Sequence, residues 1–480
     1  MRIIGRQKEM AKLKKLHSNK RFEFVVVKGR RRVGKTFLVD TVFNLKYTFM
    51  HTGVSPEEVK EDESGILKTE LTFFLQSLKK YGYTSQEPIN SWIDAFAALE
   101  SLLEKKDNGQ RMVVFIDELP WLDTPKSNFI SAFSYFLNNY ASKKSNMLLI
   151  VSGSTNSWLD KKFSKTYGGF YGRKTKEIKL SPLSLSESKQ LLVDNGFLLS
   201  DYEMAKLYMA FGGIPYYLSL LDSDYSLAQN IDDLFFAKDA TLKDEFNSLF
   251  NAIFRNAKKA QEIVRALSTR QAGFTQSEIS NMIGAQTGGT FSETLDALES
   301  SDIISTYHPF GEYANIRCYK LIDPFCLFFL RFIERCDTLD PTFFQDNQFS
   351  QKVSIYHGFA FENLVYYHIG KVKEALGISG VTSNIAALRI DDEKGGKSTQ
   401  IDLLIVRKDN VVDLCEIKFY NDAYVLKESY LEYLRKRNAL LSSKLKKTQI
   451  IENVLISPFG IKRNEHSSYF QKVVTLKQLF

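Results

Sequence analysis

The segment from Gly29 to Thr36 has the residue types and spacing that bind nucleotide phosphates. It reads GRRRVGKT, so four residues separate the first glycine from the closing GKT triplet. Gly29 and Gly34 let the backbone turn its N–H groups toward phosphate oxygens. Lys35 supplies a positive charge for the β- and γ-phosphates, and the hydroxyl of Thr36 is a ligand for Mg²⁺. An apolar run, FEFVVVK, precedes the segment and a helical pattern follows it. The sequence therefore predicts a site for a nucleotide and Mg²⁺.

Two further apolar runs end in polar residues that suit the same site. MVVFIDEL ends in Asp117 and Glu118, and NMLLIVSGS ends in serines that include Ser154. We expect Asp117 to hold Mg²⁺ and Glu118 to orient or deprotonate the attacking water. Adjacent acids at a strand end are common by themselves. Here they lie one crossover connection after the phosphate loop, and that position indicates a nucleotide site. Ser154 is expected to sense the γ-phosphate, and an ordinary serine cluster between strand and loop is an equal alternative.

A second group of chemically active residues lies in QIDLLIVRKDNVVDLCEIKF. If this stretch is a hairpin centred on Asp409, Asp402 lies directly opposite Glu416, and Lys418 lies on the same face as Glu416. The rest of that face is apolar, where uncompensated charge is costly. The three side chains are therefore expected to hold a metal ion or to form a structural ion pair, and this geometry alone does not distinguish the two.

Charge differs between two predicted helices of the carboxyl-terminal half. The segment YLRKRNALLSSKLKK carries a basic cluster that can follow a phosphate backbone, or that is simply a solvated face. The members of the cluster are Arg435, Lys436, Arg437, Lys444, Lys446 and Lys447. By contrast TFSETLDALESSD has four acids and no lysine or arginine. We expect this second helix to contact protein rather than DNA.

The order of the predicted elements divides the chain into four parts. Residues 1–180 alternate buried apolar runs with helical patterns, as in an α/β core with a parallel sheet. Residues 181–250 read as helices alone and form a predicted lid. Residues 251–340 read as three helices followed by a hairpin, which is winged-helix order. Residues 341–480 read as a helix, the hairpin around Asp409, a basic helix and two strands.

The composition sets limits on the class of protein. With 480 residues, 44% hydrophobic and 25% charged residues, the chain is long enough for several soluble domains. The net charge of +8 is a mild bias, compatible with an acidic partner. Four dispersed cysteines disfavour disulfides and zinc. The amino terminus lacks a secretory pattern, and the run FCLFFLRFI is too short to span a bilayer, so it is expected to be a buried helix. We expect a cytoplasmic protein with no membrane partner.

The quoted segments, together with IIGRQKEMAKL, FIDELPWL, GGIPYYL and YKLIDPFCLFFLRF, resemble the archaeal-type ATPases of the STAND superclass. The resemblance covers most of the chain and implies a RecA-like P-loop ATPase core whose nucleotide is ATP, a helical lid and a winged helix. It also implies that Gly5 and Arg6 lie near the nucleotide base. Arg173 is either an arginine finger or a solvated charge.

The arginines inside the phosphate loop are expected to point away from the phosphates, because the backbone is what faces them. Arg30, Arg31 and Arg32 would then point outward, toward the lid, a neighbouring domain or a polyanion. The sequence does not decide among these partners.

The order of Asp402, Glu416 and Lys418 resembles the PD-(D/E)xK nuclease superfamily. The resemblance implies that Asp402 and Glu416 hold Mg²⁺, that Lys418 assists the attacking water, and that Glu362, on an upstream helix, completes the set. The proline of the motif is absent, because Gln400 and Ile401 precede Asp402. The fourth part of the chain is then a restriction-endonuclease-like α/β domain.

Two functions follow from these resemblances. The first is an ATPase coupled to a Mg²⁺-dependent nuclease domain that acts on nucleic acid. The alternative is a STAND-like ATP-driven switch or scaffold whose carboxyl-terminal domain only binds nucleic acid or a protein partner. A protein partner is also expected on the winged helix. Both functions share the ATPase, so only the chemistry around Glu416 separates them.

Overall fold

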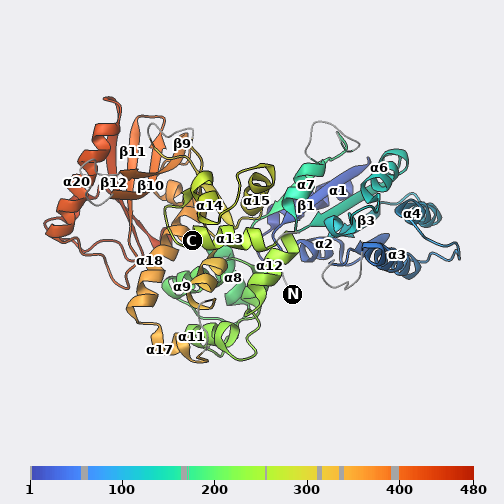
Figure 1. Cartoon of the computed structure of the whole chain (residues 1–480), viewed down its shortest axis with the longest axis horizontal. Helices are drawn as coiled ribbons and strands as arrows, with labels where there is room; N and C mark the ends of the chain where they lie inside the picture. Colours follow the sequence, from blue (N-terminus) through green and yellow to red (C-terminus); the bar gives the residue numbers. More distant parts are fainter. Residues whose placement is uncertain are drawn as a thin grey trace. The chain divides into compact units, whose positions relative to one another are not determined.

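The computed structural model describes residues 3–55, 63–163, 170, 172–254, 257–310, 316–334, 340–390 and 399–480. Within these ranges the side chains of residues 63–64, 387–390, 399–400 and 402 are not described. The chain forms two compact units. The first is Met1–Pro182 with Ser248–Ala257, and the second is Leu183–Asn247 with Lys258–Phe480 (Figure 1).

A five-stranded parallel sheet forms the centre of the first unit, in the order β2-β3-β4-β1-β5. The strands are β1 (Glu23–Gly29), β2 (Phe49–Thr52), β3 (Met112–Asp117), β4 (Met147–Gly153) and β5 (Lys176–Leu180). Strands β1, β3 and β4 are buried along their whole length, as the apolar runs predict for strands covered on both faces. The predicted parallel α/β core is confirmed. Strands β2 and β5 were not predicted, because they are shorter and carry polar residues.

Helices cover both faces of this sheet. On one face, Phe24 and Val26 of β1 pack in a cluster with Phe133. On the other face, Val25 packs in a cluster with Leu38. The helices are α1 (Gln7–Ser18), α2 (Lys35–Phe43), α3 (Glu63–Lys80), α4 (Trp92–Lys106), α5 (Leu119–Leu122), α6 (Phe129–Asn139) and α7 (Asn156–Phe163), with the short helix η1 (Ala141–Lys143). The strand period alternates side chains between these two clusters, which fixes the sheet between two helical layers.

The second unit begins with helices, as predicted for residues 181–250. They are α8 (Leu185–Asp194), α9 (Asp201–Phe211), α10 (Pro215–Ser219), α11 (Leu227–Ile231), η2 (Asp232–Phe236) and α12 (Glu245–Ile253). Ser184 and Ser200 start α8 and α9 with capping boxes that satisfy the first backbone N–H groups. A boundary between the two units lies within α12, since the segment Ser248–Ala257 belongs to the first unit.

Three helices and a three-stranded antiparallel sheet follow, in the order predicted from the sequence plus one short strand. The elements are α13 (Ala257–Leu267), β6 (Phe274–Thr275), α14 (Gln276–Met282), α15 (Gly289–Ser300), β7 (Ile304–Tyr307) and β8 (Cys318–Leu321). The predicted capping box of Thr275 and Glu278 is present. Next come α16 (Pro324–Phe332), α17 (Phe343–Asn347), α18 (Gln351–Tyr367) and α19 (Ile369–Ala375). Helix α16 is the buried helix expected from its apolar run.

A mixed sheet closes the chain, in the order β13-β12-β11-β10-β9. Its elements are β9 (Ser383–Ile390), β10 (Thr399–Arg407), β11 (Val411–Ile417), α20 (Glu428–Lys444), β12 (Ile450–Ser457), η3 (Ser467–Tyr469), β13 (Lys472–Thr475) and η4 (Leu476–Leu479). Strands β9, β10 and β11 are antiparallel, whereas α20 returns the chain so that β12 runs parallel to β11. Leu404 pairs with Leu414, so the hairpin is centred on Asp409 as predicted.

Contacts within the second unit join its first helices to later parts of the chain. The backbone N–H of Leu185 donates to Nε2 of His368 at 3.0 Å. The rings of Tyr202 on α9 and Phe419, after β11, stack with centroids 4.8 Å apart. The division of this unit into lid, winged helix and carboxyl-terminal domain remains a prediction. Within the described ranges, no helix combines the length and apolar character needed to cross a bilayer.

Candidate nucleotide site and carboxyl-terminal ion cluster

The carboxyl ends of three neighbouring strands bring the predicted nucleotide residues together. Lys35 opens α2 a few residues after β1, Asp117 ends β3, and Ser154 follows β4. Because β1, β4 and β3 are parallel neighbours, their ends meet at the same edge of the sheet.

The backbone of the loop requires its two glycines. A Cβ atom at Gly29 would lie 2.5 Å from the carbonyl oxygen of Leu180 on the adjacent strand. Gly34 has φ of +93°, in the left-handed region, and caps the amino terminus of α2. The free N–H groups at such a helix start attract anions. This geometry fits a bound phosphate chain.

Lys35 is buried at the centre of the loop. Its Nζ donates to the carbonyl oxygens of Gly29 and Arg30 at 3.1 and 3.2 Å, and to Oγ of Ser154 at 2.7 Å. All three ammonium hydrogens of Lys35 therefore have acceptors. These hydrogen bonds hold the positive charge of Lys35 beside the loop backbone that would surround a phosphate. Ser154 is thus joined directly to the loop, as its predicted sensing role requires.

Thr36 and Asp117 present the oxygen atoms suited to Mg²⁺. Oγ1 of Thr36 donates to Oδ2 of Asp117 at 2.7 Å, and the hydroxyl of Ser152 donates to Oδ1. Burial, and then the neighbouring charge of Glu118, raise the pKa of the Asp117 carboxyl. Mg²⁺ prefers hydroxyl and carboxylate oxygens, and its charge would favour the ionised carboxylate. The residues present therefore fit this ion.

Glu118 lies in the same hydrogen-bonded group. Its carboxylate accepts from the backbone N–H of Ser154 at 2.9 Å and from the Ser154 hydroxyl at 2.6 Å, and it lies 3.4 Å from Nζ of Lys35. Its backbone has φ of +47°, an uncommon conformation for a residue with a side chain. The side chain therefore reaches the carboxyl end of β4 rather than open solvent.

Arg6 also contacts the loop. Its Nη2 donates to the carbonyl oxygens of Val33 at 3.4 Å and of Ser181 at 2.7 Å. Gly5 before it is buried, with φ of +63°. These contacts tie the amino-terminal segment to the phosphate loop, while the role of both residues near a nucleotide base remains a prediction.

The prediction that all three arginines of the loop point outward is wrong for Arg30. Arg30 is fully buried, whereas Arg31 and Arg32 are partly exposed. Nη1 of Arg31 donates to the carbonyl oxygen of Ser248 at 3.4 Å, on the part of α12 that belongs to the first unit. Sequence spacing shows only that these residues lie in a loop, not which side of it packs. Arg173 is exposed, and its role as an arginine finger remains undecided.

A buried ion cluster surrounds Glu416, near the end of β11. Its Oε1 accepts from the hydroxyl of Tyr430 at 2.6 Å and lies 2.8 Å from Nζ of Lys418. Its Oε2 lies 2.6 Å from Nη2 of Arg437. Tyr430 and Arg437 are two turns apart on α20, so the same face of that helix supplies both. Burial alone would raise the pKa of Glu416, but the charges of Arg437 and Lys418 hold it below its usual value.

Arg437 corrects the predicted surface cluster. Arg437 was predicted to belong to the basic cluster that follows a phosphate backbone or faces solvent, but only 5% of its side chain is exposed. It lies on the buried face of α20 with Leu434 and Leu441. The spacing of these three residues, at i, i+3 and i+7, is the signal that would have placed Arg437 inside. The other five members of the cluster are exposed.

The predicted metal ligands around Glu416 are described only in part. Leu403 pairs with Cys415, the last described pair of the β10–β11 ladder on this side, and the placement of Asp402 opposite Glu416 remains a prediction. The side chain of Asp402 lies outside the described residues. Glu362 accepts a hydrogen bond from Gln271. Among the side chains that are described, no group of three or more His, Cys, Asp or Glu residues is arranged to hold a metal ion.

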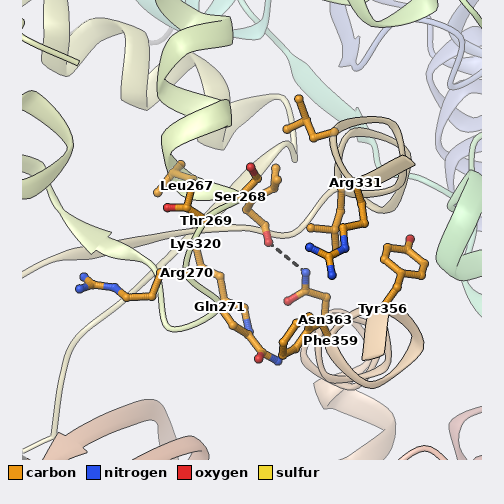
Figure 2. A pocket seen from close by; sticks show the side chains of 13 residues that line it. Leu267, Ser268, Thr269, Arg270, Gln271, Lys320, Arg331, Tyr356, Phe359 and Asn363 are labelled. Carbon is orange, nitrogen blue, oxygen red and sulfur yellow. Dashed lines mark hydrogen bonds between the residues drawn. The ribbon is translucent and has the colours of Figure 1, made fainter. Parts of the chain in front are cut away.

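A cavity of about 300 Å³ adjoins the Glu362 region of α18. Figure 2 shows Phe359 and Asn363 of α18 beside Gln271, with Arg331 of α16 on the facing side. Nδ2 of Asn363 donates to the carbonyl oxygen of Leu321 at 3.0 Å. This face of α18 therefore packs on the segment that contains Gln271, which explains the hydrogen bond to Glu362.

Residues 3–221 match the model of a family described as an ATPase domain predominantly from Archaea. The chain therefore carries an archaeal-type ATPase domain, and the resemblance predicted from the sequence is confirmed for this part. The match includes the phosphate loop, both acids after β3 and Ser154.

Similar proteins cover more of the chain at low identity. An uncharacterized protein of Methanocaldococcus jannaschii is 24% identical over 366 residues, 75% of this chain and 76% of that protein. The Walker-type ATPase of Pyrococcus abyssi is 19% identical and covers 68% of this chain and 96% of its own, with a TM-score of 0.45. The ORC2 protein of Aeropyrum pernix, solved as ADPNP-ADP complexes, is 11% identical, with coverage of 68% and 93% and a TM-score of 0.41. These TM-scores are too low to define a shared overall fold.

Proposed function

We propose that the first unit hydrolyses ATP with Mg²⁺ and that the mixed sheet of the second unit carries a metal-dependent nuclease site. The observation that supports the ATPase chemistry best is the group of side chains around Ser154. It joins Lys35, the phosphate-binding cation, to Glu118, the candidate base, through one hydroxyl.

The roles in ATP hydrolysis follow from the position of each group. The loop backbone and Lys35 bind the phosphates, and Thr36 and Asp117 hold Mg²⁺, which supplies charge stabilisation for phosphoryl transfer. Glu118 orients the attacking water and accepts its proton. Ser154 and Lys35 also contact the Glu118 carboxylate, which holds it beside the phosphate loop.

Substitution of Glu118 tests this assignment. Glu118→Gln keeps the size of the side chain but is a poor base, so we expect turnover to fall about 10²–10⁴-fold while ATP binding is retained. Lys35→Ala should weaken ATP binding itself. The measurements are phosphate release and the equilibrium binding of a fluorescent ATP analogue. Glu87→Gln, at an exposed site in the same unit, is the control, and equal turnover in Glu118→Gln would remove Glu118 from this role.

The nuclease site is supported by the register of the hairpin. Leu403 pairs with Cys415, so the same register continued by one residue would set Asp402 opposite Glu416, and Lys418 lies 2.8 Å from Glu416. Asp402 and Glu416 would hold Mg²⁺, and Lys418 would stabilise the charge that develops on the scissile phosphate. Glu416 already accepts three donors, so one acceptor position remains for the ion.

The three donors around Glu416 also favour a second candidate function. A carboxylate with three donors is typical of a structural ion cluster, and the carboxyl-terminal domain would then only bind its partner while ATP drives a switch. A cleavage assay decides between the two, with plasmid and single-stranded DNA, Mg²⁺ or Mn²⁺, and with or without ATP.

Lys418→Ala is the critical variant in that assay. We expect it to abolish metal-dependent cleavage while ATP hydrolysis in the first unit continues, which also reports that the protein is folded. Lys472→Ala, at an exposed position on β13, should cleave as wild type does. If wild type cleaves nothing with either ion, or if Lys418→Ala cleaves undiminished, the nuclease assignment fails and the binding function stands.

A further inference from the structure

Aromatic side chains surround the ion cluster at Glu416 and lead from it to solvent. Nζ of Lys418 lies 4.8 Å from the ring centroid of Tyr430, and the Tyr430 ring lies 5.5 Å from that of Tyr433. In the chain segment after Lys418, the rings of Tyr420 and Tyr424 are 5.6 Å apart. Tyr424 also interacts electrostatically with Lys418 and Glu416. The two outer rings are exposed, 51% for Tyr420 and 39% for Tyr433.

These two exposed rings are not part of the core of the domain. The buried face of α20 consists of Leu431, Leu434, Arg437 and Leu441, and Tyr433 lies off that face. Tyr420 lies in the segment that connects β11 to α20. A large aromatic ring left in water next to a charged site is a typical platform for stacking a nucleic-acid base.

Exposed charges of both signs occur on the segments that carry the rings. Lys462 lies beside Tyr424, because its backbone N–H donates to the Tyr424 carbonyl oxygen at 2.9 Å. Exposed cations here are Lys427, Arg435, Lys436, Lys462 and Arg463, and exposed acids are Asp422, Glu428, Glu432 and Glu465. Such a mixed surface gives little net charge. Duplex binding depends on neutralising many phosphates, whereas a single strand gains affinity from stacking on aromatic rings.

We propose that this surface, formed by Tyr420, Tyr433 and the exposed cations between them, binds single-stranded nucleic acid. Each ring stacks one unpaired base, and the cations contact the intervening phosphates. Lys418 contacts the Tyr430 ring, which neighbours Tyr433, and precedes Tyr420 by two residues, so a strand held by these rings would pass close to the ion cluster. The inference deepens the proposed nuclease function by naming its substrate, but strand binding itself requires no cleavage.

Binding by the full chain in EDTA tests the inference without cleavage. The probe is a fluorescein-labelled, mixed-sequence DNA of about 20 nucleotides, longer than a typical single-strand site, used alone and annealed to its complement. We expect the single strand to bind at least about tenfold more tightly than the duplex. Tyr420→Ala and Tyr433→Ala should each weaken single-strand binding by about 5- to 100-fold, the loss expected for one stacked base.

Two kinds of control separate stacking from misfolding. Tyr420→Phe and Tyr433→Phe keep the ring and should bind within about twofold of wild type, because stacking uses the ring face. Tyr135→Ala, which removes a 63%-exposed tyrosine from the first unit, should leave binding unchanged. Equal affinity for duplex and single strand, or Ala variants that bind as wild type does, would overturn the inference. Loss of cleavage with single-strand binding intact would count only against the nuclease function.

Discussion

Two buried carboxylates, Asp117 and Glu70, and the half-buried Glu118 differ in what surrounds them within the first unit. Asp117 accepts from two hydroxyls and Glu118 from Ser154. Glu70 on α3 accepts from the backbone N–H of Val54 at 3.0 Å, and its Oε2 is buried with no hydrogen-bond partner among the described residues. Burial raises the pKa of Glu70 to about 7 from an ordinary 4.5. The carboxylates at the nucleotide site thus have hydrogen-bond donors for their oxygens, whereas one oxygen of Glu70 has none among the described residues.

Glu70 predicts a pH-dependent effect on stability. Because its folded pKa is above its unfolded pKa, the folded state binds the extra proton, and stability falls as pH rises from about 4.5 toward 7. Glu70→Gln removes that penalty and keeps the bond to Val54. We expect it to raise the unfolding free energy by about 1–3 kcal/mol at pH 8 and by almost nothing at pH 4.5.

Chemical denaturation of both proteins at the two pH values measures this difference. Glu87→Gln, an exposed site in the same unit, should show no pH-dependent gain. A gain for Glu70→Gln that is as large at pH 4.5 as at pH 8 would show that the effect is not ionisation.

Among the elements, the turn from β1 to α2 depends on close backbone packing. Gly29→Ala would bring a Cβ atom to 2.5 Å from the Leu180 carbonyl oxygen on β5, so β1 or β5 must shift. We expect a loss of stability of about 1–3 kcal/mol, as for other overpacked sites, together with weaker ATP binding. Thermal unfolding and binding of a fluorescent ATP analogue measure the two effects.

Gly358→Ala is the matched control for this change. Gly358 lies within α18, where an added Cβ meets open space, so alanine should be neutral or stabilise the helix slightly. If Gly29→Ala binds ATP as wild type does, the close approach of β1 and β5 does not shape the phosphate site.

Helix α20 has separate buried and exposed faces, and we expect only the exposed cations to contact nucleic acid. The double variant Arg435→Ala, Lys436→Ala should weaken single-strand binding and reduce the salt slope, log K against log salt, by about 1.4, which is roughly 0.7 for each phosphate that the variant no longer neutralises. A salt titration by fluorescence anisotropy measures the slope. Lys79→Ala with Lys80→Ala, exposed on α3 in the first unit, should leave it unchanged. An unchanged slope in the α20 variant would mean that its cations contact no phosphate.

At the scale of the whole molecule, the two compact units predict two thermal transitions. Only the first unit contains the phosphate loop, and a ligand stabilises the unit that binds it. With Mg²⁺ and free ATP analogue about 100-fold above Kd, we expect one transition to rise by roughly 5–10 °C. Differential scanning calorimetry measures both, with Lys35→Ala as the variant that should show no shift. A single transition that moves as a whole would mean that the two units unfold together.

The phosphate loop, the two acids at the end of β3 and the register of the hairpin could be predicted from the sequence alone. These features are local or periodic: the spacing from Gly29 to Thr36 lies within one turn, and the strand period sets Leu404 opposite Leu414 once the turn is known. Buried strands were found because continuous apolar runs mark strands covered on both faces. Short strands with polar residues, such as β5, have no such signal.

Which charged side chains are buried depends on tertiary packing, and what they contact could not be predicted from the sequence. Arg30 and Arg437 are buried although their neighbours in sequence, Arg31 and Lys436, reach the surface. The helical spacing with Leu434 and Leu441 marks the position of Arg437 as inward, whereas no local pattern distinguishes Arg30. In both cases a charge is tolerated inside only where the fold supplies compensating groups from distant segments. Glu416 on β11 supplies the compensating charge for Arg437 on α20. The fold also joined Gln271 to Glu362, residues whose separation in the chain carries no sequence signal of contact.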